Sequence, residues 1–87
     1  MGSRAVPSYR ASVPSRKTKP RLQSRLAAGL RRERSRRGWT QERAAEAAGL
    51  NARHYQKLEE GSVNVTLRTL ERLSRAFGVD VSRLFAS

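Results

Sequence analysis

Apolar residues recur at helical spacing from residue 21 to residue 87, and glycines separate the periodic runs. Leu22, Leu26 and Leu30 form a row at four-residue intervals, which predicts a first helix that ends before Gly38. Gly29 lies inside this row and lowers its helix propensity. No segment alternates apolar and polar residues over a length that predicts a strand.

Two short helices are predicted next from their capping residues. Thr40 can cap an alanine-rich helix at 41–48 that stops at Gly49. Asn51 can then cap a helix at 52–60, which a further glycine ends.

The last part of the chain predicts two more helices. Thr66 can open one that ends before Gly78, with these apolar residues on one face: Leu67, Leu70, Leu73, Ala76 and Phe77. Asp80 can cap a final short helical turn. The sequence therefore predicts an all-α domain of five helices at 21–87.

The first twenty residues show no period. They hold all three prolines of the chain among Ser, Arg, Lys and small residues, so they can bury little apolar surface. Such a segment does not offset the entropy cost of ordering, and we expect residues 1–20 to form a disordered basic arm. A basic, serine-rich start without acidic residues is also typical of an organellar transit peptide.

Positive charge is concentrated at the start of the chain. Of the formal net charge of +12, residues 1–38 carry +11 and residues 39–87 carry only +1. This imbalance indicates an anionic partner, with nucleic acid more consistent than a membrane surface.

Composition excludes several other classes. The chain has no cysteine, which excludes disulfides, thiolate metal sites and cysteine nucleophiles. It has no apolar run of about 20 residues and no signal-peptide pattern, and it assembles no nucleophile, base and orienting partner. We expect a cytoplasmic, non-enzymatic protein without a metal or cofactor.

The segment 41–60 carries the functional signal. Its two short helices are joined by a three-residue turn that contains a glycine, as in a helix-turn-helix. Ala45 allows close helix crossing, Gly49 allows a positive φ at the turn, and Tyr55 and Leu58 continue a buried stripe. The rest of the second helix is polar, cationic and rich in donors, as a major-groove reader requires.

Two longer motifs extend this pattern: RRGWTQERAAEAAGLNARHYQKLEEG at 36–61 and TLRTLERLSRAFGVDVSRLF at 66–85. Together they resemble the Cro-type, lambda-repressor-like helix-turn-helix family (the XRE family) and cover about two thirds of the chain. SVNVTLRTL is also similar to small restriction–modification controller proteins and other stand-alone repressors. The resemblance implies a compact lambda-repressor-like domain that binds DNA.

The resemblance also assigns contact residues. Gln41 and Asn64 match positions that typically contact DNA phosphate, and Gln41 also lies at a helix N-terminus. The positions that face base edges and flanking phosphates are matched by Asn51, Ala52, Arg53, His54 and Lys57. Of these, Arg53 and Lys57 can engage guanine O6 and N7.

Other residues complete the predicted interface. Arg36 and Arg37, which end the first helix near Gln41, and Gln56 on the polar face are expected near phosphates. In the arm, four cations can follow phosphates or enter the minor groove: Arg16, Lys17, Lys19 and Arg21. The apolar residues of the last segment are expected to form a homodimer surface: Val81, Leu84 and Phe85.

Two acidic residues depart from the family pattern. Glu33 and Glu71 stand where apolar residues are usual. Each is either solvated, paired with neighbouring arginines, or compensated by a partner subunit.

The function predicted is a sequence-specific bacterial transcriptional regulator, a repressor or controller, that reads the major groove with helix 52–60. One such helix reads only about 4–5 base pairs, so a homodimer on a palindromic double-stranded operator is expected. One alternative is an antitoxin or adaptor whose main partner is a protein. Another is a basic RNA-binding or ribosome-binding protein without sequence preference in DNA.

Overall fold

The computed structural model describes residues 21–86, which form five α-helices and no strand. The helices are α2 (Arg21–Arg37), α3 (Gln41–Ala48), α4 (Ala52–Glu60), α5 (Leu67–Phe77) and α6 (Val81–Leu84). These bounds confirm the predicted all-α class. The predicted arm at 1–20 and residue 87 lie outside the described residues. Within 21–86, no helix is long and apolar enough to span a membrane.

Side-chain caps define where four of the helices begin. The caps are Thr40, Asn51, Thr66 and Asp80, and each side-chain oxygen accepts a hydrogen bond from a backbone N–H two or three residues later. These bonds satisfy amide groups that have no partner within the helix. The sequence therefore determines the helix starts locally.

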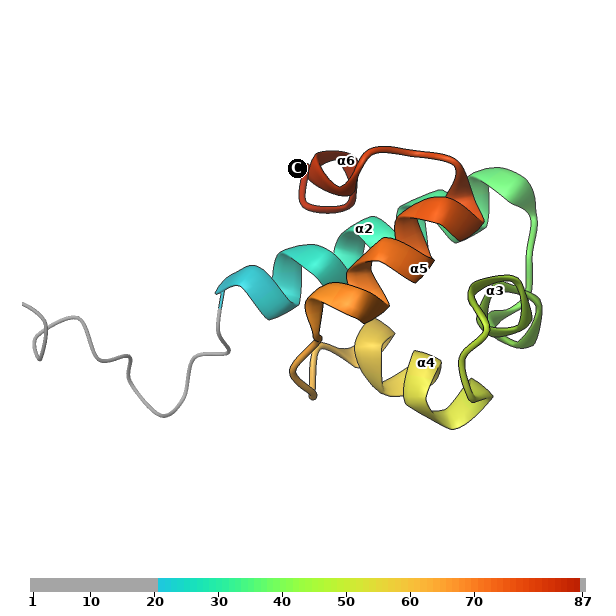
Figure 1. The fold of residues 1–87 in the computed structure, drawn as a ribbon, viewed down its shortest axis with the longest axis horizontal. Coiled ribbons are helices and arrows are strands. Elements are labelled where there is room, and N and C mark those ends of the chain that lie inside the picture. Colours follow the sequence, from blue (N-terminus) through green and yellow to red (C-terminus); the bar gives the residue numbers. More distant parts are fainter. Residues whose placement is uncertain (1–20, 87) are drawn as a thin grey trace, which may run out of the picture.

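The core lies between α2, the longest helix, and the shorter helices packed around it (Figure 1). In the view of Figure 1, α4 lies below α2 and α6 lies above it. The largest buried apolar side chains come from all the described helices except α3, which contributes small alanines: Leu26, Leu30, Tyr55, Leu58, Leu73, Phe77 and Leu84. Because one core joins all the helices, α4 is held rigidly against α2 and α3.

Helix α6 packs directly on α2 at Gly29. A Cβ atom at this position would lie 1.8 Å from the carbonyl oxygen of Leu84, so only glycine permits the contact. The Leu84 side chain is fully buried by this packing. The prediction that Leu84 forms a dimer surface is therefore wrong, because its side chain belongs to the core of its own protomer.

Two leucines predicted on apolar helical rows are instead exposed. Leu22 is 63% exposed in the first turn of α2, and Leu67 is 81% exposed in the first turn of α5. The prediction that Leu67 shares the buried face of its helix is wrong. It lies about 120° around the helix axis from buried Leu73 and has no core element opposite it.

Candidate nucleic-acid interface

Helices α3 and α4 form the helix-turn-helix. Gly49 ends α3 in the left-handed conformation, with φ 69°, and the next amide, of Leu50, donates to the carbonyl oxygen of Ala45 at 2.8 Å. Ala45 is almost fully buried where the helices cross. Tyr55 and Leu58 are buried on the inner side of α4. This arrangement agrees with the steric set that the sequence predicts for the turn.

The outer face of α4 is exposed and polar. Asn51, Ala52 and Arg53 are exposed at its beginning, Gln56 and Lys57 follow along the helix, and His54 is half-buried. The structure thus brings the predicted base-reading residues together around the first two turns of one helix. Their contacts with bases remain a prediction.

Arg53 and Lys57 are the cations of this outer face. Among residues 21–86, neither side chain forms a hydrogen bond or ion pair. Asn51 is different, because its Oδ1 accepts from the amides of Arg53 and His54 at 2.8 and 3.3 Å. Its oxygen serves as the helix cap, which leaves its side-chain amide nitrogen for an external acceptor.

Behind this face, the buried carboxylate of Glu59 joins three helices. It accepts hydrogen bonds from Arg34 of α2 at 2.6 and 3.1 Å and from the Tyr55 hydroxyl of α4 at 2.6 Å. Gln41, the first residue of α3, donates to it at 3.0 Å. Burial alone would raise the pKa of Glu59, but these hydrogen bonds, from Arg34 first, hold the pKa below its ordinary value.

The same carboxylate keeps Tyr55 neutral. Burial, together with the hydrogen bond to Glu59, raises the pKa of the Tyr55 hydroxyl far above its ordinary value. Tyr55 therefore acts as a buried donor and core residue, as predicted, and not as an exposed stacking platform.

Gln41 connects this buried cluster to the outer face of α4. Its side-chain nitrogen donates to Glu59, and its Oε1 accepts from Gln56 at 3.2 Å. Two of the predicted phosphate-contacting residues, Gln41 and Gln56, are thus hydrogen-bonded to each other. Both lie beside the N-terminus of α3, where backbone amides favour an anion.

Asn64 lies in the loop between α4 and α5, and its Oδ1 accepts from Gln23 of α2 at 2.6 Å. This bond ties the loop to the beginning of α2. The residue is exposed, so the predicted phosphate contact stays a prediction.

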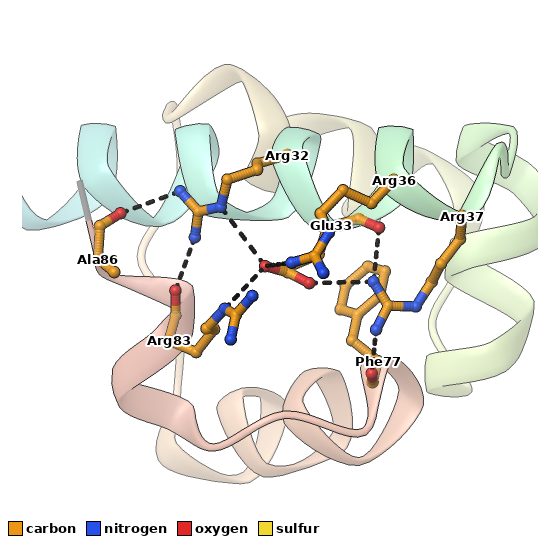
Figure 2. A network of polar contacts seen from close by, with 7 residues as sticks. All are labelled: Arg32, Glu33, Arg36, Arg37, Phe77, Arg83 and Ala86. Carbon is orange, nitrogen blue, oxygen red and sulfur yellow. Dashed lines mark hydrogen bonds and ion pairs between the residues drawn. The ribbon is translucent and has the colours of Figure 1, made fainter.

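Glu33 forms a second buried cluster on another side of α2 (Figure 2). Its Oε1 lies 3.0 Å from Arg37, and its Oε2 lies 3.4, 3.6 and 3.4 Å from Arg32, Arg36 and Arg83. Burial would raise the pKa of Glu33, but the four guanidinium groups, Arg37 first, hold the pKa below its ordinary value. Of the explanations open for Glu33, pairing with arginines is the one observed, whereas Glu71 is exposed.

This cluster corrects the assignment of Arg37. Its guanidinium also donates to the carbonyl oxygens of Glu33 and Phe77 and lies 5.1 Å above the Phe77 ring. The predicted phosphate contact of Arg37 is wrong, because its donors hold α2 to α5. Arg36, about half exposed, turns toward the same carboxylate, and we leave it outside the DNA-facing set.

The predicted arm contacts cannot be placed in the same way. Arg16, Lys17 and Lys19 lie outside the described residues. Arg21 is the first residue of α2, and its side chain is also outside the description.

Sequence analysis missed Arg34 as the partner of Glu59. The available signal was the spacing of Tyr55 and Glu59, which lie four residues apart and so share the buried side of α4. A carboxylate on a buried stripe requires a cation nearby.

Comparison with known proteins agrees with this geometry. Residues 30–84, more than half of the chain, match the HTH_3 family, which is described as helix-turn-helix. No curated protein matches the chain. Solved structures do match, and three of them share 28–30% sequence identity with it.

The first of these structures is the restriction–modification controller protein C.AhdI from Aeromonas hydrophila, with a TM-score of 0.69 and 28% identity over 72% of this chain and 96% of that chain. The hypothetical transcription factor NHTF from Neisseria has a TM-score of 0.73 and 29% identity over 78% and 76% of the two chains. The clp gene regulator ClgR from Corynebacterium glutamicum has a TM-score of 0.70 and 30% identity over 77% and 71%. With the family match and the turn geometry, these likenesses show that the chain belongs to the HTH_3 (XRE-type) helix-turn-helix family of DNA-binding transcriptional regulators.

Proposed function

We propose that the protein regulates transcription by inserting α4 into the major groove of an operator. The observation that carries this proposal is the two-sided character of α4. Its inner side is fixed by Tyr55, Leu58 and Glu59, whereas Arg53 and Lys57 on its outer side have no partner among the described residues. A rigid helix with available cationic donors suits recognition of guanine edges.

Contacts to the DNA backbone would position this helix. Gln41 and Gln56 lie together beside the N-terminus of α3, whose dipole favours a phosphate. Asn64, in the loop after α4, is placed to contact a second phosphate. Such contacts fix the register of a protein on the duplex but carry no sequence information.

Affinity and sequence choice come from different parts of the chain in this proposal. Residues 41–60 hold three basic and four acidic side chains, whereas residues 1–38 carry a net charge of +11. The basic part supplies attraction that falls with salt concentration, and the outer face of α4 supplies discrimination between sequences.

The operator is proposed to be palindromic and to bind two copies of the chain. One recognition helix spans only about 4–5 base pairs, and helix-turn-helix dimers read two half-sites about one helical turn apart. C.AhdI is a restriction–modification controller and ClgR is a gene regulator, which supports a repressor or controller role in a bacterial cell.

Selection of bound sites from a pool of random duplexes tests this function. The full-length protein is expected to enrich one consensus with two inverted half-sites. Recovery of sequences without any shared motif, with equal binding of RNA, would contradict it and indicate a general nucleic-acid-binding protein. A scrambled version of the enriched duplex serves as the control for binding by charge alone.

A further inference from the structure

The exposed apolar side chains gather at one end of the fold. Leu22 and Leu67 are the large hydrophobic residues that residues 21–86 leave exposed. Each lies in the first turn of its helix, and α2 and α5 begin at the same end of the molecule, at the left in Figure 1. Monomeric surfaces rarely concentrate large apolar groups in this way.

A hollow of about 330 Å³ lies at the same end. Its lining residues are Leu22, Gln23, Asn64, Val65, Leu70 and Phe85. Val65, Leu70 and Phe85 are partly buried and pack against the core, so the floor of the hollow is rigid. The volume is about ten times the roughly 30 Å³ share of one water molecule, which is enough for a leucine side chain.

The charges around the hollow distinguish between occupants. None of the six lining residues is ionisable, so the hollow offers nothing to a phosphate backbone. Arg25 lies beside it, but its guanidinium already donates to the carbonyl oxygen of Phe85 at 2.8 and 3.1 Å. A second copy of a chain with a net charge of +12 can approach this uncharged region with the least repulsion.

The knob and the hollow also fit a two-fold arrangement. Leu67 lies one helical turn before Leu70, which lines the hollow, so the two features share one face. A two-fold axis can therefore place each Leu67 in the hollow of the other copy and close the assembly at two chains. Arg68 and Glu71, both exposed on the same helix, give the rim one charge of each sign.

We propose that this end of the fold, with Leu67 as the knob and the hollow beside it as the hole, is the homodimer surface. It replaces the predicted surface on α6, of which only Phe85 lines the hollow. The dimer's purpose rests on the proposed two-part operator, whereas the surface rests on the exposure, the hollow and the charges. The surface adjoins the loop that holds Asn64, so dimer formation also fixes the distance between the two α4 helices.

Light scattering after size exclusion, over a range of concentrations of the full-length chain, tests the proposal. The wild type is expected at twice the 9.8 kDa chain mass, and Leu67→Lys at the mass of one chain. Ser35→Lys, which adds the same charge to exposed α2 surface at the opposite end from Leu22, should remain dimeric. Circular dichroism verifies that Leu67→Lys stays folded, as expected for a side chain that is 81% exposed.

A monomeric wild type, a Leu67→Lys variant that stays dimeric, or an assembly larger than two chains would each overturn the proposed surface. The DNA-site selection is read separately. A palindromic site recovered with an unchanged Leu67→Lys dimer rejects the surface and leaves the proposed function intact. A dimer disrupted by Leu67→Lys, without any preferred DNA sequence, supports the surface and rejects the function.

Discussion

Glu59 is the residue on which the position of α4 depends most. Its carboxylate accepts from Arg34, Tyr55 and Gln41, which belong to α2, α4 and α3. A buried carboxylate with good partners is not in itself a large stabiliser, but removing its charge leaves a buried guanidinium without compensation. The cluster therefore controls both stability and the placement of Gln41 beside the DNA face.

The substitution Glu59→Gln tests this role. Loss of the carboxylate should lower the free energy of unfolding at pH 7 by about 3 kcal/mol, because Arg34 and Tyr55 lose a charged acceptor. Urea unfolding measures the change. Glu46→Gln is the control, since its side chain is 77% exposed and its contact with Arg43 spans 3.6 Å. The control should change by less than about 0.5 kcal/mol, and an equal loss in both variants would contradict the role.

The same pair of variants has a pH signature. The pKa of Glu59 is below its ordinary value of 4.5 in the fold, so the unfolded chain takes up the proton first as pH falls. The stability from Glu59 is thus present above about pH 4.5 and is lost as pH falls through the folded pKa. Glu59→Gln should lose less stability than the wild type between pH 5 and pH 3, whereas parallel losses would exclude the cluster as the cause.

At this scale, sequence predicts the turn residues but not the partners of charged groups. Ala45, Gly49 and Tyr55 follow from steric requirements at fixed spacing, and the structure agrees. The pairing of Arg37 with Glu33 and Phe77 depends on where α5 passes, which local spacing does not encode. A run of arginines therefore resembles a DNA-binding patch in sequence even where a member holds two helices together.

Helix ends are local properties, and the sequence predicts them well. Caps such as Thr40 and Asn51 and the left-handed Gly49 act within three residues, so a short window contains the whole cause. The docking of α6 on α2 has a different origin. It depends on Gly29 and Leu84, which are 55 positions apart, and sequence alone suggests only that Gly29 weakens its helix.

The substitution Gly29→Ala tests the docking. Within an ordinary helix, alanine in place of glycine would stabilise by roughly 0.5–1 kcal/mol. Here the new Cβ would meet the Leu84 carbonyl oxygen at 1.8 Å, so we expect a net loss of about 1–3 kcal/mol in the free energy of unfolding. Amide hydrogen exchange in α6 should also accelerate as the helix is displaced.

Ser35→Ala, on the exposed side of α2, is the matched control and should change stability by less than about 0.5 kcal/mol. A Gly29→Ala protein that is as stable as the wild type, with unchanged exchange in α6, would show that the close contact is not required.

The whole molecule divides its surface by chemistry. The outer face of α4 presents partly cationic donors, the beginning of α2 and α5 presents an uncharged hollow and Leu67, and the side of α2 near α6 holds the arginines around Glu33. Composition indicates an anionic partner for the whole chain, but it does not reveal that the groove-reading unit is almost neutral. That division becomes visible only when the helices are placed.

The division makes Arg53 the most direct probe of the account, since its side chain is exposed on α4 and has no partner among the described residues. Equilibrium binding of wild type, Arg53→Ala and Arg75→Ala should be measured on the selected operator and on a scrambled duplex, at one salt concentration. Arg75 is an exposed cation in the last turn of α5, so its variant removes the same charge elsewhere.

Arg53→Ala is expected to weaken binding to the operator by roughly 5- to 150-fold, the equivalent of about 1–3 kcal/mol, with a much smaller effect on the scrambled duplex. Arg75→Ala should affect both duplexes slightly and equally. Equal losses on the two duplexes for Arg53→Ala, or no loss on the operator, would contradict the claim that the outer face of α4 reads the sequence.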